Sequence, residues 1–515
     1  MRASSSNFQR PYYLIIALFL AGLGVRLFLC DLSTRWGYFQ DHFDFIGMGI
    51  TAREHGLFSI YTVPVEDNPV VHGRIYQSDK GEYYGLDYPV PLVANYPPLG
   101  AGLFWIQTEL LSIVQPKPYA NTYLSRVIMS STAILAEIIL VFGVFFVARH
   151  LFGRKTALIA GAVCWLFPPL ALNSSFFGQT DAWPLAAGVF ALYFMLNNRW
   201  GSAGFAIGIA CMLKPQGILF IPAALFAVLV IPCSQERLSM ISVLKRLTSV
   251  GLSALATLSL IALPWTMTDG LAWLREAFLH NVDKYPFTTA RALNFWYLDL
   301  LHLDAAPSFT DVDAGAKILG LSKNSWGALA SLTMVGLLAA ACRRLFRNAP
   351  TVAVVAFTGF YLWTLFIMLT QVHDRYIVYC MPFILIAALK YYRLLPALLL
   401  LALVGIAEHT WEVWLPGPAA GTFKKEIVEM YHQDFIAQYE RQQHSDRPFK
   451  TGPPSFDQSV SIYRSGYEEA RHIYRPREYI ATILSILAYT IALAGLFTVR
   501  PGLVDHEGNL HKTSS

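Results

Sequence analysis

Long apolar runs with almost no charge constrain the fold of this chain more than any other feature of its sequence. Examples are residues 12–30, 127–148, 256–268 and 481–499, which are long enough, or nearly so, to cross a bilayer core of about 30 Å. Only 14% of all residues are charged, against about a quarter in ordinary globular proteins. The sequence therefore predicts an all-α polytopic membrane protein and excludes a soluble one.

The apolar runs predict about twelve transmembrane helices. Their approximate ranges are 11–30, 124–148, 156–172, 182–198, 201–213, 217–233, 248–268, 324–342, 349–370, 376–390, 394–408 and 478–499. No small-residue cleavage site follows the first run, so it is interpreted as a retained span and not as a signal peptide. The six cysteines lie in or beside apolar runs, which gives no sign of a disulfide framework.

The distribution of basic residues predicts the orientation of these spans. If the N-terminus is cytoplasmic, most Lys and Arg residues fall on inner turns, while the short outer turns hold only Lys214 and Arg375. This is the positive-inside pattern, and it places both termini in the cytoplasm. Counting residues 99–114 as a span would break the pattern, so they are interpreted as a re-entrant or interfacial helix.

Three parts of the chain are expected. Residues 1–408 form a transmembrane core with a large first outer loop at about 31–123. Residues 409–477 form an outer-face loop region, and residues 478–515 form the last span and a cytoplasmic tail.

There is no phosphate-cradling Gly-rich loop, no nucleophile elbow and no Cys/His metal set in the sequence. We expect no cofactor, and no metal, because the cations described below could do the work of a metal. The small net charge of +5 reflects topology and not a nucleic-acid partner.

Short polar clusters lie where predicted spans meet the outer face. They are Asp41 with Asp44 and residues 94–100, 173–183, 213–217, 293–296 and 371–376. A charge at the centre of a span costs about 2.5–3.5 kcal/mol on insertion scales. Any one cluster could be a solvated loop end, but the gathering of all six on one side favours a shared polar cavity.

The cations of these clusters suit an anionic ligand. Lys214, His373 and Arg375 could pair with a phosphate or diphosphate near the membrane interface. Lys214 precedes Pro215 at a break between two short spans, which places its ammonium group at a helix end. The alternative for Lys214 is a side chain that merely extends toward water.

The acids leave several alternatives open. Asp41 and Asp44, three residues apart, would share one helix face, where either could act as a general base; one of them could instead cap a helix expected from Phe45 to His55. Asp181 could orient a hydroxyl or a metal, or cap the next span. Glu137, inside the second predicted span, could face the cavity or pair with a cation of another span.

Two aromatic features also have alternatives. Tyr96 opens the segment Tyr96-Pro97-Pro98, which fixes an extended turn and on physical grounds alone needs no chemical role. Trp296 could stack on a sugar or belong to the aromatic belt at the membrane interface.

Six motifs together resemble a known superfamily. In order along residues 41 to about 385 they are "DHFDFIGMGITAREHGLFSIY", "NYPPL", "SSFFGQTDAW", "LKPQGILFIP", "RALNFWYL" and "HDRYIVYCMPFI". They resemble the GT-C superfamily of integral-membrane glycosyltransferases, which take sugar from a polyprenyl-phosphate carrier. The prokaryotic mannosyltransferases related to the enzyme that adds the second mannose of GPI anchors are the most similar group.

The resemblance implies roles for individual residues. Asp41 matches the catalytic base, with Asp44 as second choice. The donor phosphate would be held by Lys214, Gln216, His373 and Arg375. The substrate would be contacted by Tyr96, Gln179, Asp181, Asn294, Trp296 and Asp374. Aspartate at position 374 replaces the usual glutamate, Glu137 replaces an aspartate, and the loop 409–477 is longer than expected.

The resemblance also implies an activity: inverting transfer of a hexose, with mannose as first candidate, from a polyprenyl-phosphate carrier to a glycan or lipid-linked acceptor on the outer face. The expected partners are membrane lipid, the donor and the acceptor, with no nucleic acid. Two alternatives are a lipid-linked-sugar flippase without transferase activity and a structural subunit of a glycan-assembly complex. The flippase would suit the broken short spans, but transporters place their sites near the midplane between repeated halves, and the sequence has neither feature.

Overall fold

A computed structural model describes residues 10–37, 40–63, 94–117, 119–231, 239–279, 288–289, 292–302, 315, 317–410 and 456–498. Regular structure in these residues is helical, except for one antiparallel hairpin of β1 (Lys317–Ile318) and β2 (Leu321–Ser322). The prediction of an all-α membrane protein is confirmed, and the short hairpin was not predicted.

The helices of the first half carry the first four polar clusters at their ends. They are α1 (Arg10–Trp36), α2 (Gln40–His55), η2 (Leu57–Ser59), α3 (Pro98–Val114), α4 (Tyr123–Phe152), α5 (Arg154–Trp165), α6 (Pro168–Ala171), η4 (Leu172–Phe176), α7 (Ala182–Leu196), α8 (Trp200–Leu213), η5 (Pro215–Phe220), α9 (Ile221–Val230), α10 (Met240–Asp269), α11 (Ala272–Leu274) and η6 (Arg275–Leu279).

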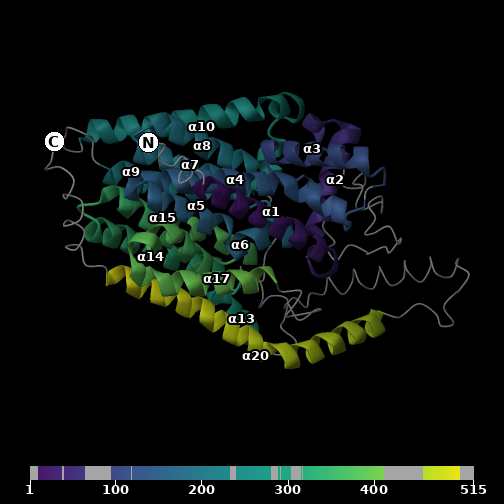
Figure 1. The fold of residues 1–515 in the computed structure, drawn as a ribbon. Coiled ribbons are helices and arrows are strands. Elements are labelled where there is room, and N and C mark those ends of the chain that lie inside the picture. Colours follow the sequence, from purple (N-terminus) through teal and green to yellow (C-terminus); the bar gives the residue numbers. More distant parts are fainter. Residues whose placement is uncertain are drawn as a thin grey trace, which may run out of the picture.

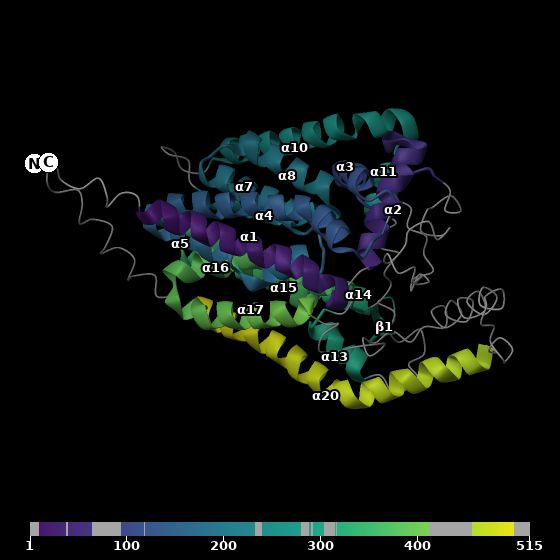
Figure 2. The same ribbon diagram turned by 45° about the vertical axis from the view of Figure 1, so that its right-hand side comes forward.

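The helices of the second half complete the bundle. They are α13 (Phe295–His302), α14 (Lys323–Leu345), α15 (Pro350–Met368), η7 (Asp374–Cys380), α16 (Met381–Lys390), η8 (Tyr392–Leu394), α17 (Leu395–His409) and α20 (Phe456–Phe497). Figures 1 and 2 show the long helices side by side, with α10 along one edge and α20 along the other, and with α2 and α3 at one end.

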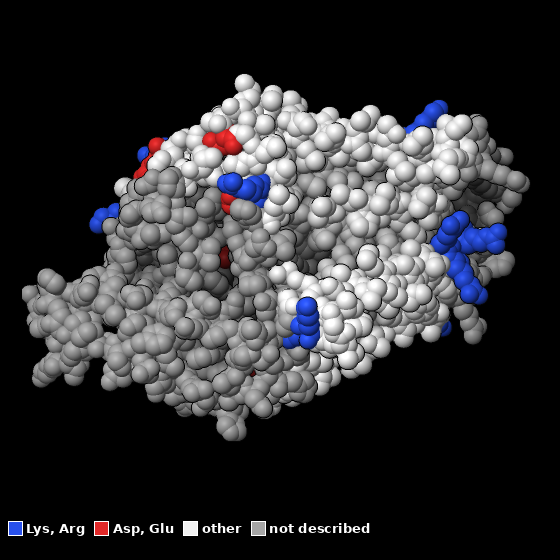
Figure 3. Space-filling view, turned by 180° about the vertical axis from the view of Figure 1, so that it is seen from behind, with Lys and Arg blue, Asp and Glu red and all other residues white. Residues whose placement is uncertain are grey.

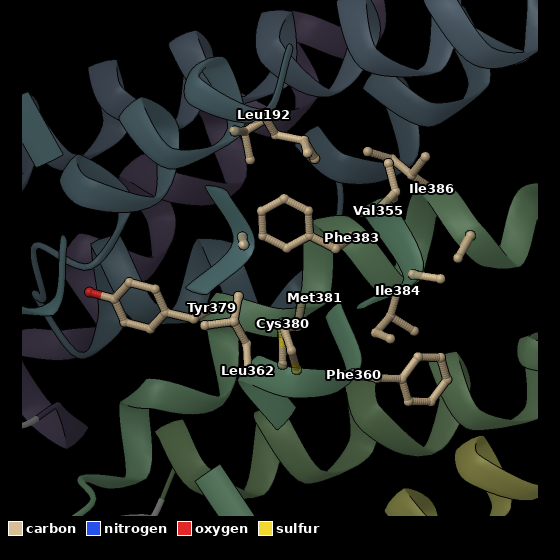
Figure 4. Close-up of a cluster of buried hydrophobic side chains, with 14 of the residues drawn as sticks. Leu192, Val355, Phe360, Leu362, Tyr379, Cys380, Met381, Phe383, Ile384 and Ile386 are labelled. Carbon is tan, nitrogen blue, oxygen red and sulfur yellow. The ribbon is translucent and has the colours of Figure 1, made fainter. Parts of the chain in front are cut away.

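The core of the bundle is apolar, and small residues bring its helices close together. α15 is buried on nearly all sides, as expected of a helix that is hydrophobic all round. A Cβ atom at Gly204 of α8 would lie 2.2 Å from the carbonyl oxygen of Val250 in α10, so only glycine permits this approach. Figure 4 shows part of the core, where Phe383 and Ile384 lie among side chains of α7 and α15.

Among the described residues, seven helices are long and apolar enough to cross a membrane, or eight if the bent pair 154–165 and 168–176 forms one span. Every predicted span overlaps a helix, but the number twelve is not confirmed. α7, α8 and α9 have 15, 14 and 10 residues, and at 1.5 Å per residue such helices are shorter than a bilayer core.

Two predicted boundaries were wrong. α2 begins at Gln40 and not at Phe45, so Asp44 lies inside the helix and cannot cap it, while Asp41 lies in the first turn, where the helix dipole favours an acid. α20 begins at Phe456, well before the expected residue 478. Most of the predicted loop region 409–477 lies outside the described residues, so the division into three parts stays a prediction.

Glu137 belongs to the bundle core and not to a polar cavity. Its carboxylate accepts a hydrogen bond from Arg26 Nε at 2.5 Å, and both side chains are buried. The Arg26 guanidinium also donates to the carbonyl oxygens of Gly22 and Trp165, each at 3.0 Å, and lies 3.6 Å from the centre of the Trp165 ring. Of the two alternatives for Glu137, the structure shows the ion pair with another span, which joins α1, α4 and α5.

The surface has the charge distribution of a membrane protein. Figure 3 shows a broad uncharged band, with Lys and Arg side chains beyond it at one end and both acids and bases toward the other. Many large apolar side chains are exposed on the long helices, including Leu14, Leu135, Leu252 and Leu332. Such a surface is expected to face lipid, so the protein is an integral, multi-pass membrane protein.

Candidate active site

Asp181 lies at the centre of a group of buried polar side chains. It precedes the first residue of α7 and its side chain is fully buried. Lys214 Nζ lies 2.6 Å from Asp181 Oδ1, and the Tyr379 hydroxyl donates to the same oxygen at 3.0 Å. On the other oxygen, Asn173 Nδ2 donates at 3.3 Å, and Arg375 Nε lies 3.9 Å away. Asp181 thus has two cationic partners from different elements.

Lys214 reaches Asp181 because α8 ends there. Its backbone is extended, and Pro215 begins the next helical segment, since proline disfavours helical geometry in the residue before it. The ammonium group is nearly inaccessible to solvent, and this burial lowers the pKa of Lys214 to about 8 although Asp181 favours the charged form.

Arg375 connects Asp181 with Asp41. Its Nη1 atom lies 3.7 Å from Asp41 Oδ2, and Gln179 Nε2 donates a hydrogen bond to the same Asp41 oxygen. Burial disfavours the guanidinium charge, but Asp41, Tyr376 and Asp181 outweigh it and raise the pKa of Arg375. The four residues Asp41, Asp181, Lys214 and Arg375, which we name the charged cluster, come from the ends of four elements that meet at one end of the bundle.

Asp44 differs from Asp41 in its electrostatic environment. Both acids lie in α2, one turn apart. Burial, together with the negative charge of Asp41, raises the pKa of Asp44 well above its usual value, because two neighbouring carboxylates do not easily ionise together. Asp44 is therefore protonated over a wider pH range than an ordinary aspartate.

Aromatic side chains surround the charged cluster. The Lys214 ammonium lies 5.8 Å from the centre of the Tyr96 ring and 5.9 Å from that of Tyr376. The Tyr96 hydroxyl shares a hydrogen bond with Thr180 at 3.2 Å, and Gln216 Nε2 donates to the Tyr376 hydroxyl at 2.5 Å. Tyr96 and Gln216 therefore lie beside the cations, and a substrate contact from Tyr96 and a phosphate contact from Gln216 stay predictions.

The turn formed by residues 373–376 is held by one of its own side chains. The buried Asp374 carboxylate accepts a hydrogen bond from the Arg375 backbone N–H at 2.7 Å, and this contact helps to fix the start of η7. The His373 ring packs against Tyr376, with ring centres 5.3 Å apart. Asp374 thus supports the backbone of Arg375, and a substrate contact from Asp374 stays a prediction.

Asn294 and Trp296 support the segment before this turn. Asn294 Nδ2 donates to the carbonyl oxygen of Leu369 at 3.1 Å, and Trp296 Nε1 donates to that of Met368 at 2.8 Å. Trp296 also lines a cavity of about 740 Å³ with apolar walls, formed by residues of α13, the β1–β2 hairpin, α14 and the end of α15. These hydrogen bonds go to backbone carbonyls and not to the charged cluster.

Three further polar residues of the site did not stand out in the sequence. Asn173 Nδ2 lies 3.0 Å from Nε2 of the buried His409, whose Nδ1 lies 2.6 Å from the Gly405 carbonyl oxygen. That carbonyl can only accept, so Nδ1 carries the proton and Nε2 accepts from Asn173. Figure 4 shows the Tyr379 ring at the edge of the apolar core with its hydroxyl turned outward, toward Asp181. Tyr379 follows Arg375 by one helical turn, a spacing that could have identified it.

No metal site accompanies these residues in the described part of the chain: no three His, Cys, Asp or Glu side chains are arranged to hold an ion. Asp41 and Asp181 both contact Arg375, so each already has a cationic partner. A metal-independent site stays a prediction.

Gly178 allows the turn that carries Gln179 and Asp181 to approach α2. Its φ angle is +72°, and a Cβ atom there would lie 1.8 Å from Nε2 of the buried His42. A left-handed backbone costs a non-glycine residue about 1–2 kcal/mol. We expect Gly178→Ala to destabilise the protein by more than this, because the new Cβ atom would also collide with His42. Thermal unfolding in detergent measures this, with Gly102→Ala, where a Cβ atom would meet nothing within 4 Å, as the control. An unchanged midpoint for Gly178→Ala would contradict the geometry.

Comparison with known proteins supports the resemblance seen in the sequence. Residues 122–265 match the family model described as Dolichyl-phosphate-mannose-protein mannosyltransferase. GPI mannosyltransferase 1 from Saccharomyces cerevisiae (strain ATCC 204508 / S288c) is 30% identical over 158 residues, which are 30% of this chain and 36% of that protein. The chain therefore matches only about a third of the length of this curated relative. The family match contains Asn173, Gln179, Asp181, Lys214 and Gln216.

Two solved structures are also similar, both of ArnT from Cupriavidus metallidurans. The one bound to undecaprenyl phosphate has a TM-score of 0.42 at 16% identity and covers 94% of this chain and 77% of ArnT. The apo structure has a TM-score of 0.43 at 15% identity and covers 95% and 78%. Over residues 122–265 the chain is therefore a helical membrane protein similar in sequence to mannosyltransferases, in agreement with the resemblance to the GT-C superfamily noted in the sequence.

Proposed function

We propose that this protein is an inverting glycosyltransferase that moves a hexose, with mannose as first candidate, from a polyprenyl-phosphate carrier to an acceptor hydroxyl. The acceptor is a glycan or a lipid-linked glycan, and the reaction takes place on the outer face of the membrane. The observation that carries this proposal is the charged cluster: Asp41 lies 3.7 Å from Arg375, and Arg375 and Lys214 meet at Asp181.

Asp41 is the proposed base. Its carboxylate takes the proton of the acceptor hydroxyl while that oxygen attacks the anomeric carbon of the donor. The bond from the anomeric carbon to the phosphate oxygen breaks, and its electron pair leaves with the carrier phosphate. Gln179 holds the Asp41 carboxylate through one oxygen, which leaves the other for the acceptor. A single in-line displacement converts a β-linked donor into an α-linked product.

Lys214 and Arg375 are the proposed phosphate-binding residues. The carrier leaves as a phosphate monoester, whose negative charge exceeds that of the donor diester, and fixed cations stabilise such developing charge. Gln216 and His373 lie on the same segments and complete the proposed phosphate site. The names of the matched family and relative, both mannosyltransferases, favour mannose as the transferred sugar.

Transfer in a reconstituted membrane tests this function. Purified protein in proteoliposomes is given radiolabelled polyprenyl-phosphate mannose, then the glucose and arabinose analogues, with lipid extracts as a source of acceptor. Label that moves from the carrier to an acceptor supports the proposal and identifies the sugar. Label that crosses the bilayer while still on its carrier would favour the flippase, and neither transfer nor movement would favour a structural subunit.

The pKa of Lys214 predicts an alkaline limit to donor use. Its charged form binds the donor phosphate, so kcat/KM for the donor should fall as the pH rises through about 8, the pKa of this residue, because kcat/KM reports the free enzyme. A Lys214→Arg variant should keep its charge at this pH, so its kcat/KM should not fall there. The same fall in both proteins would mean that another group causes it.

A further inference from the structure

Both proposed phosphate-binding cations are already paired inside the protein. Lys214 lies 2.6 Å from Asp181, and Arg375 lies between Asp181 and Asp41 at 3.9 and 3.7 Å. The charged cluster therefore contains two positive and two negative side chains. Asp181 itself is fully buried, and both of its carboxylate oxygens already have partners within the protein.

Asp181 is built to remain an anion in this position. Charge-assisted hydrogen bonds stabilise a carboxylate strongly, and Asp181 has such partners on both oxygens: Lys214 and Tyr379 on one, Asn173 on the other. Burial opposes the charge, but Lys214 and Arg375 outweigh it and lower the pKa of Asp181. His409 in turn orients Asn173.

The charge of the two carrier species explains why an internal anion would be useful. A sugar phosphodiester carries one negative charge, whereas the released monoester carries about 1.5 to 2 at neutral pH. Two unpaired buried cations would therefore bind the spent carrier more tightly than the donor. Product release limits turnover in many enzymes, so such a site would bind well and turn over slowly.

We propose that Asp181 is a positioning residue and internal counter-ion that holds Lys214 and Arg375 in place and weakens the hold of the site on the spent carrier phosphate. This inference rests on the proposed function. It assigns Asp181 a role opposite in sign to that of a substrate-binding residue: loss of its charge should strengthen binding of polyprenyl phosphate and slow its release.

The test measures the affinity of the purified full chain for polyprenyl phosphate in detergent, together with donor turnover. Asp181→Asn should bind polyprenyl phosphate at least about tenfold more tightly, with a lower KM for the donor and a lower kcat. A variant that is merely misfolded would bind more weakly. Asp31→Asn, which removes a half-exposed acid that pairs with Arg35 four residues on, is the matched control and should leave the affinity unchanged.

A second comparison covers the case in which Asp181→Asn fails to fold because Lys214 loses its partner. The double variant Asp181→Asn/Lys214→Gln removes both charges of the pair, and its reference is Lys214→Gln alone. The double variant should bind polyprenyl phosphate about tenfold more tightly than its reference, because Arg375 then faces the phosphate without Asp181. Equal affinities in this pair would overturn the inference. Wild-type protein that neither binds polyprenyl phosphate nor transfers sugar would instead overturn the proposed function.

Discussion

Replacing Asp41 by asparagine is expected to reduce sugar transfer by about 10²–10⁴-fold, the contribution typical of a positioned general base. Asparagine keeps the size of the side chain and can still bond to Gln179, but it cannot take the acceptor proton. The measurement is initial-rate transfer in proteoliposomes at saturating donor, with thermal unfolding and size-exclusion behaviour as evidence that the variant is folded and inserted.

Asp44 provides a matched control for this experiment. It lies one turn from Asp41 in α2, and burial beside Asp41 raises its pKa. A neutral asparagine resembles a protonated aspartate, so Asp44→Asn should retain far more activity than Asp41→Asn. Full activity of Asp41→Asn would reject Asp41 as the base, and the reverse ranking of the two variants would transfer the role to Asp44.

Replacing Glu137 by alanine should destabilise the protein by about 3–5 kcal/mol, the cost of leaving one partner of a buried ion pair unpaired. Arg26 would lose a contact of 2.5 Å while it remains buried among α1, α4 and α5. The measurement is the midpoint of thermal unfolding in detergent, or the fraction of protein that remains monodisperse after heating.

Removing both charges separates the ion pair from simple packing. The double variant Arg26→Met/Glu137→Leu leaves no unpaired charge, so it should recover most of the stability that Glu137→Ala loses. An equally large loss in the double variant would mean that the hydrogen bonds from Arg26 to the backbone carbonyls, and not the ion pair, hold these helices together.

The class of fold could be predicted from the sequence because hydrophobic runs and basic turns act locally. α1, α4 and α15 each follow from one apolar run. The number of membrane-crossing helices could not be predicted in the same way. α7, α8 and α9 were predicted to be spans because they are apolar. Each is short and packed against other helices, so its apolar composition reflects burial in protein as much as contact with lipid.

The residue types of the site could also be predicted, but their pairings could not. Asp41, Lys214 and Arg375 were expected near one another from the predicted outer turns. Nothing local in the sequence shows that Asp181 pairs with Lys214, 33 positions away, or that Glu137 pairs with Arg26, 111 positions away. Such contacts depend on which helix ends meet. Asn294 and Trp296 show the opposite case. They belong to a motif that was expected to contact substrate, but their side chains donate hydrogen bonds to backbone carbonyls of the segment before residue 371.

The anomeric configuration of the product tests the central claim most directly, because it reports the displacement itself. A β-linked polyprenyl-phosphate hexose is turned over by the wild-type protein, and the linkage in the isolated product is assigned by NMR. With Asp41 as the base of a single displacement, the product is α-linked. A β-linked product would require two displacements through a covalent intermediate, and it would contradict the role of Asp41 as the base of a direct transfer.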